Sequence, residues 1–364
     1  MKKITALALV LCLLLSGCGT RFDKASPFKK FRDDALSSAL QQLSADAYGE
    51  LGTGKLSVGV LRDGRVRFYS FGGASEDTVY SIGLLTQMLT GIAAQNYLDM
   101  DAPAVSYLGE GLTLPTWNGQ EITVGQLATQ TAGLADWPDN LMPGDNPCFG
   151  YSDRRFFNYL AQAKLLYEPG TEARDSAVSA ALLGNLMEWE VGGKNTRDIN
   201  LVSAKVIARA GMLSTYMAVP KSDSVPRTVG HYPNGAVSSF RQYDAMGTAA
   251  AGYSSAYDML IFAAACMDQI SSYDGASPSF PKLAREAFTA HYEGADGGRG
   301  YGCRIDALDG QTVAWQQSVF GGFGAYFGMC MDKGTAVIVL CDRECAVTEI
   351  GERLLERLNS GTAQ

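Results

Sequence analysis

The stretch FGGFGAYFGMCMDKGTAVIVLCD, residues 320–342, decides the fold. Two runs rich in aromatic and β-branched residues flank the turn Asp332-Lys333-Gly334. This pattern predicts two antiparallel strands joined by a tight turn. GCRIDA, residues 302–307, predicts one more strand just before them.

The rest of the chain predicts strands at both ends with helices between and after them. LSVGVLRDGRVRFYSFGG (56–73) reads as a hairpin around Asp63-Gly64. We therefore expect an α+β fold, sandwich-like: one antiparallel sheet flanked by helices, in a single domain over residues 35–360, with a helical subdomain inserted at about 105–250. Apolar residues recur at helical spacing in the segments 35–48, 84–97, 258–270 and 347–358.

The first residues predict export. Lys2 and Lys3 precede a short apolar run from Ile4 to Leu15, which is typical of a signal peptide and too short for a membrane span. Leu15-Ser16-Gly17-Cys18 resembles the bacterial lipobox, which implies cleavage after residue 17, a lipid on Cys18 and an extracytoplasmic, membrane-anchored protein. Residues 18–34 then read as a tether. Plain secretion with an incidental Cys18 is the alternative.

The charge and the cysteine spacing limit the classes of partner and ligand that we expect. The formal net charge is −8, and no run of Lys or Arg occurs, which argues against nucleic acid. The cysteine spacing offers no paired CxxC motif, so neither a metal site nor a cofactor is expected. Cysteine pairing stays open, with buried free thiols as the default. The six cysteines beyond Cys12 and Cys18 are Cys148, Cys266, Cys303, Cys330, Cys341 and Cys345.

Several blocks together resemble one family, the class C β-lactamases and related serine penicillin-binding proteins. In order along the chain they are TVYSIGLLTQMLTG (78–91), LATQTAGL (127–134), YEPGTEA (167–173), AGMLSTYMAVP (210–220), GYSSAYDM (252–259) and FGGFGAYF (320–327). The resemblance runs from about residue 55 to 345. It implies a β-lactamase/transpeptidase-like fold with a cleft between sheet and helical subdomain. It also implies serine attack on a lactam or D-Ala-D-Ala carbonyl.

The catalytic positions of that family carry other residues here. Its Ser-x-x-Lys motif supplies nucleophile and base from one helical turn. The matching positions are Leu84 and Gln87. Leucine has no nucleophilic atom, and a glutamine amide does not accept a proton near neutral pH.

The second and third motifs are also changed. The family's Tyr-x-Asn triplet corresponds to Asp175-Ser176-Ala177, so the proton relay and the substrate amide are absent. Its Lys-Thr-Gly strand motif corresponds to Gln316-Gln317-Ser318, so the cation is lost and a side chain replaces glycine. Groups that act as a unit fail together, and the sequence therefore predicts that no catalytic residue remains.

One part of the machinery needs no side chain. By resemblance, the oxyanion hole would use the backbone N–H groups of Leu84 and Val319. The cleft would then still hold a carbonyl or carboxylate beneath an apolar side chain. The equal alternative is that Leu84 simply fills the cleft.

Other candidates for chemistry are weaker. Ser81 lies three residues before Leu84 without a visible base, and Thr86 should point away from the cleft. His231 and His291 read as structural or exposed. Two further Ser-x-x-Lys spellings read as chance matches: Ser26 to Lys29 in the tether, and Ser279 to Lys282 at the start of a later helix.

Three functions follow from this pattern. The first is a membrane-anchored, catalytically inactive pseudoenzyme that binds a ligand, such as a cell-wall peptide, or a protein partner. The second is an active hydrolase of the D-Ala-peptidase or β-lactamase type that uses non-standard residues of the same cleft, with Ser81, Thr86 and Asp175 as candidates. The third is a structural surface lipoprotein.

Overall fold

The computed structural model describes residues 26–31, 34–192, 197–221, 224–270 and 279–360. The predicted signal peptide and Cys18 lie outside these ranges. The strands are β1 (Lys29–Lys30), β2 (Leu56–Arg62), β3 (Arg65–Phe71), β4 (Val79–Ser81), β5 (Tyr253–Ser255), β6 (Tyr292–Gly294), β7 (Gly297–Gly300), β8 (Cys303–Leu308), β9 (Gln311–Phe320), β10 (Phe323–Cys330) and β11 (Thr335–Cys341).

Helices joined by long loops lie between β4 and β6, and further helices flank the strands at both ends. In chain order the helices and helical turns are α2 (Asp34–Leu51), η1 (Gly83–Leu85), α3 (Thr86–Ala94), η2 (Ala104–Tyr107), α4 (Val124–Ala128), α5 (Asp153–Leu160), α6 (Ala177–Glu190), α7 (Asp198–Val202), the π-turn η3 (Ser203–Ile207), α8 (Ala208–Ala210), η4 (Asp244–Met246), α9 (Gly247–Ala250), α10 (Ala256–Cys266), α11 (Phe280–Ala287) and α12 (Thr348–Ser360). None of these described helices is both long and apolar enough to cross a membrane.

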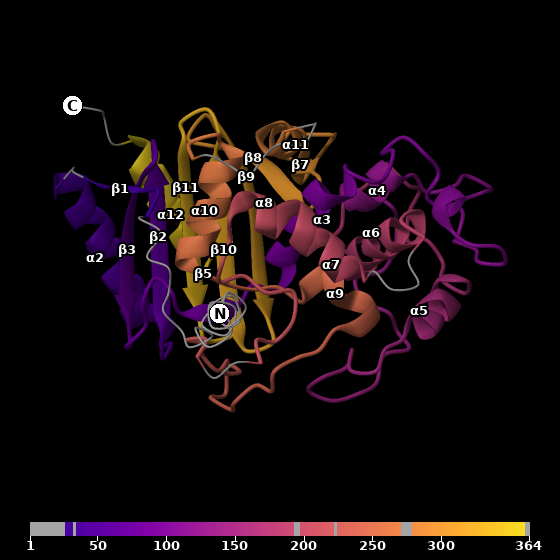
Figure 1. Cartoon of the computed structure of the whole chain (residues 1–364), viewed down its shortest axis with the longest axis horizontal. Coiled ribbons are helices and arrows are strands. Elements are labelled where there is room, and N and C mark those ends of the chain that lie inside the picture. The colour runs from indigo at the N-terminus through magenta and orange to yellow at the C-terminus, as the bar shows by residue number, and fades with distance from the viewer. Residues whose placement is uncertain (1–25, 32–33, 193–196, 222–223, 271–278, 361–364) are drawn as a thin grey trace, which may run out of the picture.

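One nine-stranded sheet organises the molecule, in the order β1-β3-β2-β11-β10-β9-β8-β7-β6 (Figure 1). All neighbours in it are antiparallel except β1 and β3. The N-terminal hairpin joins the C-terminal strands where β2 pairs with β11, as the sequence predicts. Its turn places Asp63 and Gly64 at positive φ, the geometry that matches the twist of a two-residue hairpin.

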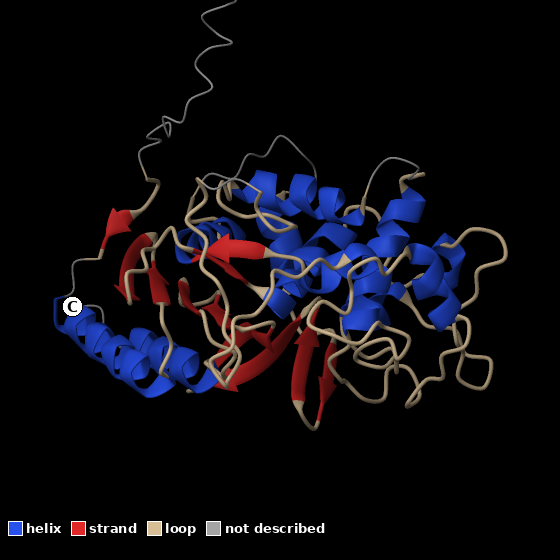
Figure 2. Ribbon diagram, turned by 90° about the horizontal axis from the view of Figure 1, so that it is seen from below, coloured by secondary structure: helices blue, strands red, loops and turns tan. Residues whose placement is uncertain are grey.

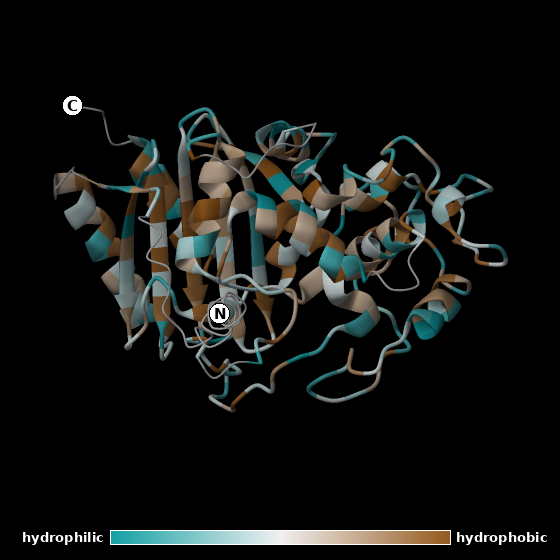
Figure 3. Cartoon of the chain, viewed as in Figure 1, coloured by the Kyte–Doolittle hydropathy of each residue, from teal (hydrophilic) through white to brown (hydrophobic). Residues whose placement is uncertain are grey.

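Every residue of β10 and β11 is buried. Because successive side chains of a strand point to opposite sides, this hairpin is buried on both faces. On β11, Ile338 and Leu340 join the larger core, while Val337 and Val339 join a second core. Figure 3 shows hydrophobic residues gathered along these central strands and the helices that cover them.

Two helical layers cover the sheet. The two terminal helices, α2 and α12, pack against each other on one face (Figure 2). On this side Gly351 of α12 lies directly against the ring of the buried Tyr326. On the other face α10 packs on β2 and β11, and α3 leads into the helical subdomain.

Two details differ from the predictions. The segment 18–34 reads as a tether, yet Lys29–Lys30 pair with β3, and the side chain of Phe31 is buried. The segment 84–97 predicts a helix with one apolar face, yet every residue of α3 is buried. The reason is position, since α3 contacts the helices α6 and α9 as well as α11.

Candidate functional site

Leu84 lies where β4 gives way to the short turn η1 and then to α3. Its side chain is half-buried and packs against the larger core. Its N–H belongs to the second residue of η1, so it has no partner within that turn. The position is thus an apolar side chain beside an available backbone donor.

Gln87 is held by a chain of hydrogen bonds between amides. Its Oε1 accepts from Gln130 Nε2 at 3.2 Å, and Gln130 Oε1 accepts from the Ser176 N–H at 2.5 Å. All three residues are buried. The position that would hold the base is therefore a neutral amide whose acceptor is already used.

The triplet 175–177 lies at the start of α6. Ser176 caps the helix, because its hydroxyl accepts from the Ser179 N–H at 3.0 Å. Ala177 is buried, and its N–H donates to Asp136 Oδ1 at 3.4 Å. Burial raises the pKa of the Asp136 carboxyl. Asp175 instead pairs with Arg304 of β8, with Oδ2 and Nη2 2.7 Å apart.

The Gln316 side chain forms hydrogen bonds with nearby backbone groups. Its Oε1 accepts from the Gln317 N–H at 2.9 Å, and its Nε2 donates to the Gly302 carbonyl at 3.4 Å. The family cation is thus replaced by an amide that satisfies nearby backbone. Ser318 is buried, and its hydroxyl lies so near Gly83 that a Cβ there would collide with it.

The edge of β9 beyond Trp315 is not covered by a described strand. β9 pairs with β10 from Ala314 to Phe320, but with β8 only from Gln311 to Trp315. The Gln317 N–H faces this edge, since the Gln316 side chain receives it there. The Val319 N–H, two residues on, faces the same way. Val319 is 41% exposed, which leaves its surroundings accessible.

Two contacts connect the strands of the sheet with the segment between α4 and α6, one at each end of this open edge. Near Trp315, the Arg304–Asp175 pair links β8 to the start of α6. At the other end, the Trp137 ring stacks on the Phe320 ring, with the two centroids 5.1 Å apart. The guanidinium carbon of Arg241 lies 4.4 Å from the centroid of the same Phe320 ring. These two points are five residues apart on β9, or about 16 Å.

Comparison with known proteins names the family. The model of the Beta-lactamase family matches residues 38–354. The chain belongs to the Beta-lactamase family. The fold predicted from the sequence blocks is confirmed.

Relatives in this family are distant. The D-alanyl-D-alanine-carboxypeptidase/endopeptidase AmpH of Escherichia coli strain K12 is 30% identical over 148 residues, which is 38% of this chain and 37% of that protein. A Pseudomonas fluorescens β-lactamase is 26% identical over 183 residues, 46% of this chain and 47% of its own. The matched regions thus span less than half of these curated relatives.

A solved structure shows the same architecture. The β-lactamase/D-alanine carboxypeptidase of Pseudomonas syringae superposes with a TM-score of 0.74 at 18% identity, covering 90% of this chain and 100% of that one. At this identity the likeness shows the fold alone.

Two alternative candidate residues, Thr86 and Ser81, lie at the start of α3 and in β4. Thr86 is buried; its hydroxyl donates to the Gly83 carbonyl at 2.6 Å and accepts from the Gly252 N–H at 3.0 Å. Ser81 belongs to β4, so it is not one helical turn before Leu84 as its spacing indicates. Among the described residues, no group of three His, Cys, Asp or Glu could hold a metal ion.

The histidines and the extra Ser-x-x-Lys spellings lie outside this network. The His231 ring contacts the Asp342 carbonyl at 3.0 Å, and the His291 ring stacks on Tyr301 at 4.0 Å. Ser26 accepts from the Tyr257 hydroxyl, while Ser279 occupies the N-cap position of α11 without a side-chain cap bond.

Sequence patterns did not identify Gln130, Trp137 or Arg304 as site residues. Gln130 stands inside LATQTAGL, where its spacing resembles scaffold, but its φ of +62° is unusual for a non-glycine residue. Arg304 is one charge in a predicted strand. No local pattern shows that it reaches Asp175.

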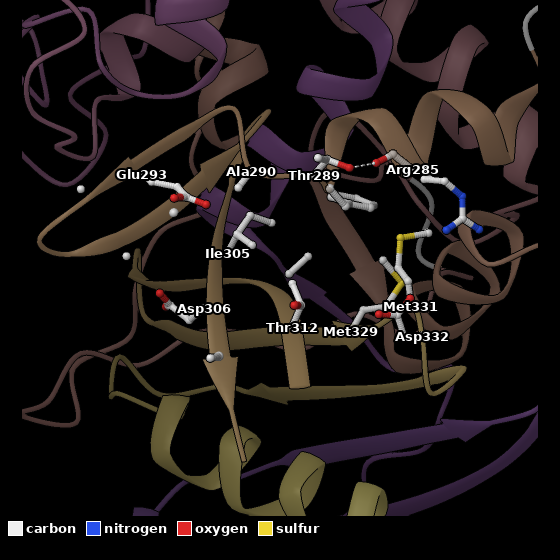
Figure 4. Close-up of a pocket in the computed structure, with 16 residues that line it drawn as sticks. Arg285, Thr289, Ala290, Glu293, Ile305, Asp306, Thr312, Met329, Met331 and Asp332 are labelled. Atoms are coloured by element: carbon white, nitrogen blue, oxygen red, sulfur yellow. Dashed lines mark hydrogen bonds between the residues drawn. The ribbon is translucent and has the colours of Figure 1, made fainter. Parts of the chain in front are cut away.

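A separate hollow of about 540 Å³ lies between α11 and strands β6 to β9 (Figure 4). Ile305 and Met329 supply apolar lining, with Glu293 and Asp306 among its polar residues. None of the positions that match the family motifs lines this hollow.

The amide chain predicts a stability effect for Gln87→Met. Methionine keeps the side-chain length but leaves Gln130 Nε2 without its acceptor, which should cost about 1–3 kcal/mol of unfolding free energy in urea denaturation. Gln42→Met on the exposed side of α2 is the matched control and should change stability by less than about 0.5 kcal/mol. Equal effects of the two substitutions would show that the amide chain does not stabilise the site.

Proposed function

We propose that this Beta-lactamase family protein is a membrane-anchored pseudoenzyme that binds an extended peptide, of the cell-wall type, along the open edge of β9. The observation that carries the proposal is the Gln87–Gln130–Ser176 chain. A base position occupied by an amide in an internal network cannot activate a nucleophile, and Leu84 supplies none.

The shape of the edge supports a peptide ligand. The Val319 N–H faces an uncovered strand edge, which is where an extended chain adds by backbone hydrogen bonds. The Leu84 N–H provides a second donor nearby, since η1 contacts β9. The contacts at Trp315 and Phe320 bound the open edge, so about four or five extended residues would fit between them.

The nature of the ligand rests on the relatives. AmpH is named as a D-alanyl-D-alanine-carboxypeptidase/endopeptidase, and the Pseudomonas syringae neighbour is named as a β-lactamase/D-alanine carboxypeptidase. A ligand related to D-Ala-D-Ala peptides follows as the proposal for this chain. The predicted lipid on Cys18 would place the cleft outside the cytoplasmic membrane, where such peptides occur.

The chain should not react with β-lactams. Incubation of the purified protein with a fluorescent penicillin should give no labelled band on a denaturing gel, and a chromogenic cephalosporin should not be turned over, because Leu84 lacks a nucleophilic atom. An active class C β-lactamase run in parallel is the positive control. A covalent adduct mapped to Ser81 or Thr86 would instead support the active hydrolase.

Val319→Pro should weaken peptide binding. Proline removes the N–H that faces the open edge and leaves the bonds to β10 in place. We expect about tenfold weaker binding of a diacetyl-Lys-D-Ala-D-Ala probe by isothermal titration calorimetry, the value of one hydrogen bond. Val319→Ala keeps the N–H and should bind like the native chain. No binding by the native chain would contradict the peptide proposal and leave a protein partner or a structural role.

Anchoring can be tested through Cys18. In a bacterial host the native chain should enter the detergent phase of a Triton X-114 partition, and Cys18→Ala should stay in the aqueous phase. Cys12→Ala, within the predicted signal peptide, is the matched control and should partition like the native chain. An aqueous native chain would favour plain secretion.

A further inference from the structure

Two thiols meet at the end of the central strand β11, two strands from Val319, because Gly324 of β10 pairs with both Cys341 and Val319. Cys341 is the last residue of β11, and Cys345 follows in the turn that leads to α12. Their sulfur atoms are 3.6 Å apart. The other described cysteines, Cys148, Cys266, Cys303 and Cys330, are all buried free thiols. Among the described cysteines, Cys345 therefore differs in being partly exposed, and it lies within 3.6 Å of a buried thiol.

The two sulfurs have unequal surroundings. Cys341 is fully buried, whereas Cys345 is partly exposed. Both lie near the Arg343 carbonyl oxygen, at 3.3 Å from Cys341 Sγ and 3.5 Å from Cys345 Sγ. The partly exposed thiol thus lies beside a buried one.

Electrostatics favours attack by the accessible sulfur. The pKa of the Cys345 thiol is lowered, chiefly by its hydrogen bond with Cys341 and also by the Arg343 guanidinium. Burial and the Asp342 carboxylate act in the opposite direction but are outweighed. The same hydrogen bond and burial raise the pKa of Cys341. Thiolate is the reactive form in exchange with disulfides.

We propose that Cys341 and Cys345 form a reactive dithiol site that is oxidised by low-molecular-weight disulfides. The Cys345 thiolate attacks one sulfur of the disulfide RSSR, forming a mixed disulfide and releasing one thiolate, which becomes RSH. Cys341 then loses its proton and attacks Cys345 Sγ, releasing a second RSH. The two protein thiols are oxidised by two electrons, and RSSR is reduced to two thiols.

The cross-link would lie in a turn that supports the end of β9. Within the turn, the Glu344 carboxylate accepts from the Gly322 N–H at 2.8 Å. The backbone N–H of His231 donates to the carbonyls of both Gly322 and Asp342. Gly324, paired with Cys341, is closely packed, because a Cβ on it would collide with the Cys345 carbonyl and approach Cys341 Sγ. Oxidation would thus close a short loop beside the β9–β10 turn.

Peptide mapping tests the site without ambiguity. Trypsin cleaves after Arg343, so the two cysteines fall on separate peptides that only a disulfide can join. The reduced full chain is incubated anaerobically with oxidised glutathione, the remaining thiols are alkylated, and the digest is analysed by mass spectrometry. We expect a linked peptide pair. We also expect Cys345 to react about tenfold or more faster than Cys303 or Cys330.

Single substitutions separate the two roles. Cys341→Ser should accumulate glutathione on Cys345, because the second step is blocked. Cys345→Ser should leave Cys341 unmodified, because that sulfur is buried. Cys330→Ser, which removes a buried thiol of β10, should still give the linked pair. The proposal is overturned if Cys345 reacts no faster than the buried thiols, or if glutathione persists on Cys345 of the native chain without a link.

Discussion

The burial of β10 and β11 on both faces is the constraint on which the rest of the structure depends. Alternate residues of one strand belong to two separate cores: Ile338 lies in one and Val337 in the other. Apolar side chains must therefore pack against the sheet on both of its faces. The terminal helices α2 and α12 supply one cover, and α10 with the helical subdomain supplies the other. On the next strand, β9, the uncovered edge begins where its pairing with β8 stops at Trp315.

Near that edge, the polar groups at the positions that match the family motifs satisfy one another by hydrogen bonds. Buried polar atoms without partners are costly, so the amides at positions 87 and 316 must complete the hydrogen bonds of the groups around them. Gln87 accepts from Gln130, and Gln316 joins a neighbouring N–H to the Gly302 carbonyl. These contacts explain how the Beta-lactamase fold keeps its shape with leucine and glutamine where the family carries serine and lysine.

Much of the fold could be predicted because its signals are local. Asp63-Gly64 marks one hairpin and Asp332-Lys333-Gly334 another, and the helix after Val347 follows its apolar spacing. The pairing of Lys29–Lys30 with β3 was missed because two lysines carry no strand pattern. The complete burial of α3 was missed because spacing reports one face of a helix and not the neighbours that later enclose it.

For the site, the sequence by itself determined which atoms are present: no nucleophile at Leu84, no base at Gln87 and no cation at Gln316. Side-chain chemistry is a property of residue type and needs no coordinates. Only the tertiary structure decided what these atoms do, namely that Gln130 reaches Gln87, that Arg304 reaches Asp175, and that Cys345 lies against Cys341. The first two contacts join residues far apart in the chain, and the third depends on how one turn folds back, so spacing alone could not specify them.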